Sequence, residues 1–198
     1  MSILAPYFLR GEPQELDSHL MTLHRELVEV YEGMRRYPVV YYYHSRRPYR
    51  SIPYTFRILG GIAGALRWGL PSGHPGSQTP WLPALITGLE TFIAYLEERF
   101  LSERLEKAPK PVPFKTFEMS FTQGEESSDT WLNRFLEVES GMREIAGIDE
   151  LPDPNEAYGR YTDWLPFAYY NRAFYEASAR DLGYTYDELA YRPGDWQF

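Results

Sequence analysis

The stretch YTFRILGGIAGALRWGL, residues 54–70, combines the period of a helix with several glycines. Its apolar residues recur at spacings of three and four, which places them on one helix face: Phe56, Leu59, Ala63, Leu66 and Leu70. Gly60 and Gly64 lie four apart on an adjacent face, with Gly61 beside them. Each glycine costs a helix about 1 kcal/mol relative to alanine, so we expect a neighbouring helix to approach this backbone closely. A ligand or anion is the alternative, because Arg57 and Arg67 flank the same face.

Four further segments have the pattern of helices: 13–36, 81–107, 128–146 and 164–182. Pro13 suits the first turn of the first segment, and Pro38 ends it because the residue before a proline disfavours helical geometry. Gly147 and Gly183 are placed to end the last two helices. The sequence therefore predicts a mostly α fold, a helical bundle of about five helices.

Two segments have the pattern of strands, which leaves an α+β fold open. Residues 39–43 are β-branched or aromatic, and 51–56 could return as a second strand, so we predict a short β-hairpin near 39–57. Pro48 and Pro53 would confine it to an edge or an extended loop. In FKTFEMSFTQ, apolar and polar residues alternate, which predicts one strand near 114–122.

Length and composition set further limits. A chain of 198 residues fits a single domain, 1–198, and the stiff connector APKPVP at 108–113 is a possible hinge between subdomains. The absence of cysteine excludes disulfides, thiolate zinc sites and cysteine nucleophiles. The longest stretch without ionised side chains is broken by prolines and glycines, so it is unsuited to a membrane. We expect a soluble, cytoplasmic protein without a cofactor, a metal or membrane contact.

The charges are distributed unevenly along the chain. Residues 33–89 contain no Asp or Glu and seven arginines, a net charge of +7, whereas the whole chain carries −8. The other 141 residues therefore carry −15. An acid-free run of this length in so acidic a chain indicates that something excludes carboxylates from it.

The densest part of this run predicts a binding segment rich in arginine and tyrosine. Arg forks grip carboxylates and phosphates, and Arg and Tyr are enriched at interface hot spots. The candidate binding residues are Arg35, Arg36, Tyr41, Tyr43, His44, Arg46, Arg47, Tyr49, Arg50 and Arg57. Three explanations stay open: pairing with carboxylates of the same chain, an acidic protein partner or neighbouring copy, and nucleic acid.

The leading functional hypothesis is a non-enzymatic binding, assembly or accessory subunit. Segment 35–57 would grip an acidic protein surface, a second copy in a homo-oligomer, or nucleic acid stacked on its tyrosines. The −15 carried by the rest of the chain slows the approach of a polyanion, which favours a protein partner.

The alternative is a small, metal-independent helical ribonuclease or another phosphate-handling enzyme centred on Arg67 and His74. Six residues separate this arginine from the histidine at a helix end. The spacing resembles the Arg-x(4–6)-His signature of the HEPN ribonucleases, which implies that both residues would act on the scissile phosphate and the 2′-hydroxyl. Trp68 stands where that family carries a polar residue, and Pro71 and Gly73 interrupt the helix.

Overall fold

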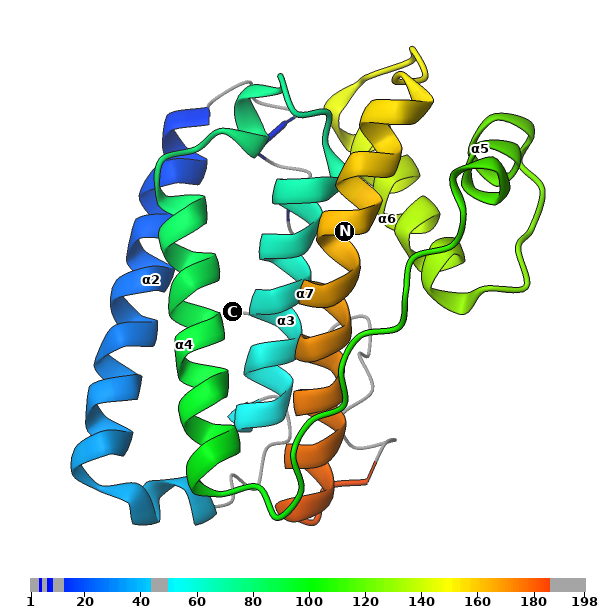
Figure 1. Ribbon diagram of the computed structural model, residues 1–198. Helices are drawn as coiled ribbons and strands as arrows, with labels where there is room; N and C mark the ends of the chain where they lie inside the picture. Colours follow the sequence, from blue (N-terminus) through cyan, green and yellow to red (C-terminus); the bar gives the residue numbers. More distant parts are fainter. Residues whose placement is uncertain (1–3, 5–6, 9–12, 44–49, 186–198) are drawn as a thin grey trace.

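The computed structural model describes residues 4, 7–8, 13–43 and 50–185, and within these ranges the chain is helical without a strand (Figure 1). The six α-helices are α2 (Pro13–Arg36), α3 (Ile52–Gly64), α4 (Trp81–Arg99), α5 (Phe114–Gln123), α6 (Thr130–Ala146) and α7 (Pro154–Asp181). Short 3₁₀ turns form η1 (Pro38–Tyr42) and η4 (Pro75–Ser77), and η3 (Ala65–Gly69) continues α3 as a π-helix. The prediction of a mostly α fold is confirmed, with one α-helix more than expected.

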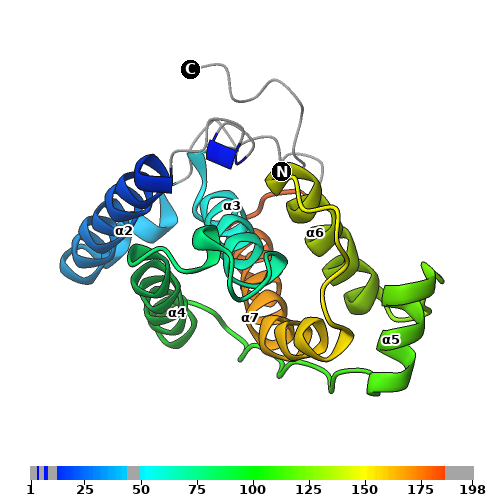
Figure 2. The same cartoon turned by 90° about the horizontal axis from the view of Figure 1, so that it is seen from above.

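The helices pack side by side in an order that differs from their order in the chain, with α3 near the centre of the molecule (Figures 1 and 2). Helix α2 lies along α4, and α4 contacts α3. Helix α7 packs along the other side of α3, and α6 contacts both α7 and η3. Helix α5 contacts α7 at the edge farthest from α2 (Figure 2). None of the helices within the described ranges is both long enough and apolar enough to cross a membrane.

The glycines of α3 let α7 approach closely. A β-carbon at Gly60 would lie 2.6 Å from the side-chain oxygen of Asn171, and one at Gly64 would touch Phe167 at 3.4 Å. Gly69, at the end of η3, meets α6 in the same way, because a β-carbon there would lie 2.8 Å from Met142. The expectation of a neighbouring helix at the Gly60–Gly64 face is therefore confirmed.

The predicted hairpin near 39–57 is wrong. Residues 38–42 form the 3₁₀ turn η1, with Pro38 in its first turn, and the expected return strand is the start of α3. Ser51 caps this helix, since its side-chain oxygen accepts a hydrogen bond from the backbone N–H of Tyr54 at 3.3 Å. Pro53 then occupies the first turn, where a proline is tolerated. The Ser-x-Pro signal favoured a helix start over a strand.

The predicted strand near 114–122 is also wrong, because this segment is helix α5. Phe117 and Phe121, four residues apart, are both buried against α7, whereas Met119 between them is exposed. Gly124 ends the helix with a backbone φ of 69°, a left-handed conformation that favours glycine. The alternation of apolar and polar residues was a coincidence within a pattern of period four.

Two helix boundaries differ from those expected. Helix α4 ends at Arg99 rather than at 107, and the following segment runs along α7 toward α5 (Figure 1). Tyr158 of α7 holds this segment by donating a hydrogen bond to the carbonyl of Val112 at 2.9 Å. Helix α7 begins at Pro154, ten residues before the predicted start, because Asp153 caps it.

The glycine contacts predict opposite effects of two alanine substitutions. Gly69→Ala should lower the free energy of unfolding by about 1–3 kcal/mol, because the new methyl group overlaps Met142 and the stiff side chain of Val138. Gly61→Ala should raise it by up to about 1 kcal/mol, since its β-carbon meets nothing within 4 Å. Urea denaturation of both variants measures the difference. Equal effects of the two substitutions would contradict the packing described here.

Candidate functional site

The structure distributes the predicted binding residues over several places. Arg35 and Arg36 end α2, Tyr41 lies within η1 and Tyr43 directly follows it. Arg50 lies just before α3, and Arg57 lies on the exposed side of α3. The remaining four predicted residues lie outside the described residues: His44, Arg46, Arg47 and Tyr49. The described members of segment 35–57 therefore lie on α2, on and beside η1, and in and just before α3.

Large apolar and aromatic side chains gather on the surface at the end of α2. Five of them within seven consecutive residues are 43–75% exposed. We define the aromatic end as these residues together with the two arginines that precede them: Arg35, Arg36, Tyr37, Val39, Val40, Tyr42 and Tyr43. Soluble proteins rarely expose so many large apolar groups side by side unless the patch binds something.

Tyr41 fastens the aromatic end to the bundle. Its ring is fully buried and stacks on Phe100, with the ring centres 4.3 Å apart and an angle of 11° between the planes. Its hydroxyl donates a hydrogen bond to Oδ2 of Asp181, at the end of α7, over 3.0 Å. Burial and the neighbouring carboxylate raise the pKa of Tyr41, which keeps this hydroxyl protonated as the donor. Tyr41 was predicted as a binding residue, but its buried side chain has a structural role.

The two arginines of the aromatic end keep their charge at the surface. Arg35 forms an ion pair with Glu32 at 3.4 Å, but both side chains are more than half exposed, so water screens the pair. The Arg35 guanidinium also lies over the ring of Tyr31, 5.6 Å from its centre. Arg36 is exposed and has no ion-pair partner among the described residues. Pairing within the chain therefore leaves this end positively charged.

The predicted binding residues did not include four members of the aromatic end: Tyr37, Val39, Val40 and Tyr42. The run PVVYYY was interpreted as a strand because β-branched and aromatic residues dominate it. Pro48 and Pro53 were the signal against a ladder of strand hydrogen bonds, and they favoured an edge or an extended loop. Without a partner strand, this run exposes Val39, Val40, Tyr42 and Tyr43 to water and buries only Tyr41 among residues 39–43.

The alternative catalytic pair lies at the turn between η3 and η4, with Arg67 in η3 and His74 at the start of η4. His74 caps η4, since its Nδ1 accepts a hydrogen bond from the backbone N–H of Gly76 at 3.0 Å, and burial lowers its pKa. Arg67 donates to the carbonyl of Ser77 at 3.4 Å, and the Ser77 hydroxyl donates to the carbonyl of His74 at 2.8 Å. Both side chains thus have bonds within the turn. Neither this turn nor the rest of the described chain gathers three His, Asp or Glu side chains that could hold a metal ion.

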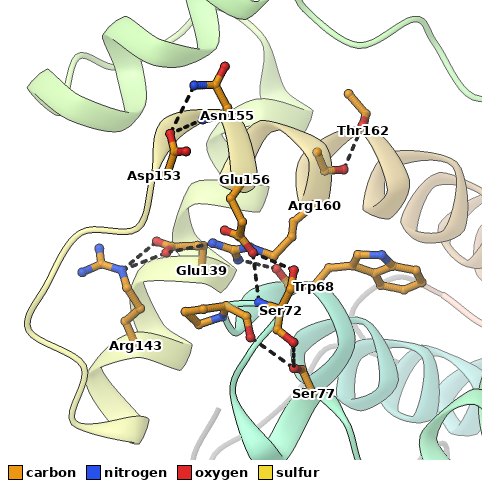
Figure 3. A network of polar contacts seen from close by, with 12 residues as sticks. Trp68, Ser72, Ser77, Glu139, Arg143, Asp153, Asn155, Glu156, Arg160 and Thr162 are labelled. Carbon is orange, nitrogen blue, oxygen red and sulfur yellow. Dashed lines mark hydrogen bonds and ion pairs between the residues drawn. The ribbon is translucent and has the colours of Figure 1, made fainter.

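A buried ion-pair network holds this turn against α6 and α7 (Figure 3). Arg160 of α7 donates to the carbonyl of Trp68, at the end of η3, over 2.7 Å and lies 3.6 Å from Glu139 of α6. Both side chains of this ion pair are almost fully buried. Arg160 also pairs with Glu156 at 2.9 Å, and Glu156 in turn accepts two hydrogen bonds from Ser72. The network satisfies an end carbonyl of η3 and links the turn to two helices.

The protonation of Glu156 should control the strength of this network. Burial alone would raise its pKa, but the hydrogen bonds from Ser72 and the charge of Arg160 outweigh burial and hold the pKa below its ordinary value of 4.5. The stabilisation is therefore complete above that ordinary value and is lost as the pH falls through the lowered pKa. Glu156→Gln should lower the free energy of unfolding at pH 7 by about 1–2 kcal/mol.

Denaturant unfolding between pH 7 and pH 3 measures this effect. The difference between the wild type and Glu156→Gln should shrink as the pH falls below 4.5, the ordinary pKa of this carboxyl. Glu150→Gln, in an exposed loop, is the control and should change the stability little at any pH. A difference that stays constant down to pH 3 would show that the charge of Glu156 is not what holds the turn.

Comparisons with known proteins returned no relative of this chain. No family model matches it, and no curated protein and no solved structure is similar to it. Its function must therefore be inferred from its own residues and their arrangement.

Proposed function

We propose that this protein is a non-enzymatic assembly protein whose aromatic end docks on an acidic protein surface. One observation carries the proposal. Among the described residues, nine large apolar or aromatic side chains are exposed, and five of these nine lie within residues 37–43. The exposed apolar surface is thus concentrated at one place rather than scattered, which is typical of an interaction site.

The chemistry of the aromatic end suits a protein interface. Tyrosine and arginine dominate interface hot spots, because each buries a large area while keeping polar groups that can bond. Three tyrosines and two arginines lie here beside two valines. Tyr41 holds the backbone of this segment in place, which lowers the entropy that a partner must remove on binding.

The charges favour an acidic partner. Residues 33–89 contain no carboxylate, so a negatively charged surface would meet no like charge from this segment. Arg35 and Arg36 would supply the complementary charge, since within the chain only the exposed Glu32 pairs with either of them in the described part. Complementary charges of this kind steer the approach and reject wrong partners.

A second copy of the chain offers such a surface at α5. Met119 of α5 is an exposed apolar residue, and three exposed carboxylates lie on α5 and just after it: Glu118, Glu125 and Glu126. Helices α2 and α5 lie at opposite edges of the molecule (Figure 2). Docking the aromatic end of one copy on α5 of the next would therefore join copies head to tail. Contacts of this type continue into rings or filaments.

Self-association should therefore depend on concentration, on salt and on the aromatic end. Tyr42→Ser combined with Tyr43→Ser removes exposed apolar surface and should weaken association at least about tenfold. Arg35→Glu combined with Arg36→Glu should weaken it further at low salt, where charges are screened least. Sedimentation velocity over a range of protein and salt concentrations measures both effects.

Val28→Ser combined with Val30→Ser is the matched control, because these residues are also exposed but lie on α2 outside the aromatic end. This control should associate like the wild type. The Glu125→Arg, Glu126→Arg protein should not associate with itself. Mixing it with the Arg35→Glu, Arg36→Glu protein should restore association, because the two sets of reversed charges are complementary. A wild type that stays monomeric at millimolar concentration and low salt would contradict docking between copies. Retention of the monomer on single-stranded DNA through Arg35 and Arg36 would favour nucleic acid instead.

A further inference from the structure

A groove of about 560 Å³ lies between α3, α6 and α7, away from the residues of the aromatic end. Its volume is in the range of small-molecule sites. Among the described residues, its charged lining consists of three arginines, Arg57, Arg134 and Arg172, without an Asp or Glu. We refer to it as the arginine groove. Of the predicted binding residues that the structure describes, Arg57 alone lines this groove.

Aromatic rings hold the three guanidinium groups. The guanidinium carbon of Arg134 lies 5.1 Å from the ring centre of Trp131, and that of Arg172 lies 5.8 Å from the same ring. Arg57 lies over Tyr175 at 5.3 Å. Arginines held over aromatic rings present their N–H forks in fixed directions, which suits bidentate binding of phosphate.

Arg172 and Arg134 differ in whether a carboxylate pairs with them. Arg172 donates from its Nε to Glu176, a residue of the same helix, over 2.6 Å. Arg134 has no ion-pair partner among the described residues, although α6 and α7 both carry acids. The groove therefore contains at least one arginine whose charge is balanced by no carboxylate within 4 Å, and an anion would provide that balance.

The floor of the groove consists of small residues without polar side chains. It includes Gly60, Gly61 and Gly64 of α3, with Ala65 and Ala168 beside them. A β-carbon at Gly61 would meet no atom within 4 Å, so the space above this residue is open. Trp131 and Trp164 stand at the wall, edge to face, with ring centres 6.0 Å apart. Such a surface suits a planar ring, because flat apolar contact and stacking need no directional partner.

One polar group at the floor has an unused acceptor. Asn171 is 7% exposed and lines the groove beside Gly60. Its side-chain N–H donates to the carbonyl of Phe167 at 2.9 Å, whereas its Oδ1 has no hydrogen-bond partner among the described residues. A buried acceptor without a partner destabilises a protein, and this oxygen lies in the space of the missing Gly60 β-carbon, so it helps to fix α7 against α3 beside the groove.

We propose that the arginine groove binds a nucleoside phosphate. The planar base would lie on the glycine floor against the tryptophans, and the phosphate would lie between Arg57, Arg134 and Arg172. The shared chemistry is a planar base with an attached phosphate, whether in a free nucleotide or in a single strand. This site is separate from the aromatic end in residues and in ligand, so either proposal can fail while the other holds.

Isothermal titration calorimetry with AMP, GMP, CMP and UMP tests the proposal, with adenosine, inorganic phosphate and a 15-residue oligothymidylate as comparison probes. At least one nucleotide should bind more tightly than phosphate alone and than the nucleoside. Gly61→Leu should weaken that binding at least about tenfold by filling the floor, and Arg134→Gln should weaken it by about five- to tenfold. The oligonucleotide distinguishes the two sources: tighter binding of the strand, lost in the same variants, assigns the groove to single-stranded nucleic acid.

Matched controls separate loss of the site from loss of the fold. Gly159→Leu adds the same side chain to an exposed, uncrowded glycine of α7 outside the groove, and Arg25→Gln removes an exposed arginine of α2. Both should bind like the wild type. Thermal unfolding should show Gly61→Leu folded, because leucine favours a helix more than glycine. Absence of binding by every nucleotide and by the oligonucleotide at millimolar concentration, or binding unaffected by Gly61→Leu, would overturn the proposal.

Discussion

The lack of side chains on one face of α3 is the constraint on which the rest of the bundle depends. Because Gly60 and Gly64 present only backbone, α7 packs so closely that Asn171 and Phe167 occupy the space of the missing β-carbons. Gly69 extends this close packing to α6. Helix α4 packs against another side of α3, and α2 packs against α4 (Figure 2). Gly61, the neighbouring glycine of α3, has nothing within 4 Å of the place of its missing β-carbon, so it leaves open space in the arginine groove.

Two surfaces with different chemistry result from this arrangement. The aromatic end exposes tyrosines and valines beside two arginines, and the buried ring of Tyr41 fixes it to Phe100 and Asp181. The groove holds its arginines over aromatic rings within a concave site. An extended patch suits a protein surface, whereas a groove of this volume suits a small molecule. The acid-free region 33–89 contributes to both surfaces, which explains why its arginines looked like a single feature in the sequence.

The sequence predicted the helical class and the close approach at Gly60 and Gly64, because both follow from spacing along one helix. It did not predict helix α5, since the alternation around Met119 imitates a strand and only the tertiary contacts of Phe117 and Phe121 show the true period. The candidate site was only partly predictable. The sequence left open whether Arg35 and Arg36 are exposed, and both lie at the surface. The burial of the Tyr41 side chain depends on Phe100 and Asp181, which are distant in the chain. Arg134 and Arg172 join Arg57 only through the packing of three helices, and no local pattern indicates that.

Hydroxyl-radical footprinting of the tyrosines at low and high protein concentration tests the central claim, that the aromatic end is a docking surface, most directly. Tyr42 and Tyr43 should be oxidised readily in dilute protein and become protected in concentrated protein, as copies cover them. Tyr41 directly precedes these two tyrosines but is fully buried. It should stay protected at both concentrations and serves as an internal reference. Equal oxidation of Tyr42 and Tyr43 at both concentrations would contradict docking between copies at this surface, and ready oxidation of Tyr41 would contradict its place in the core.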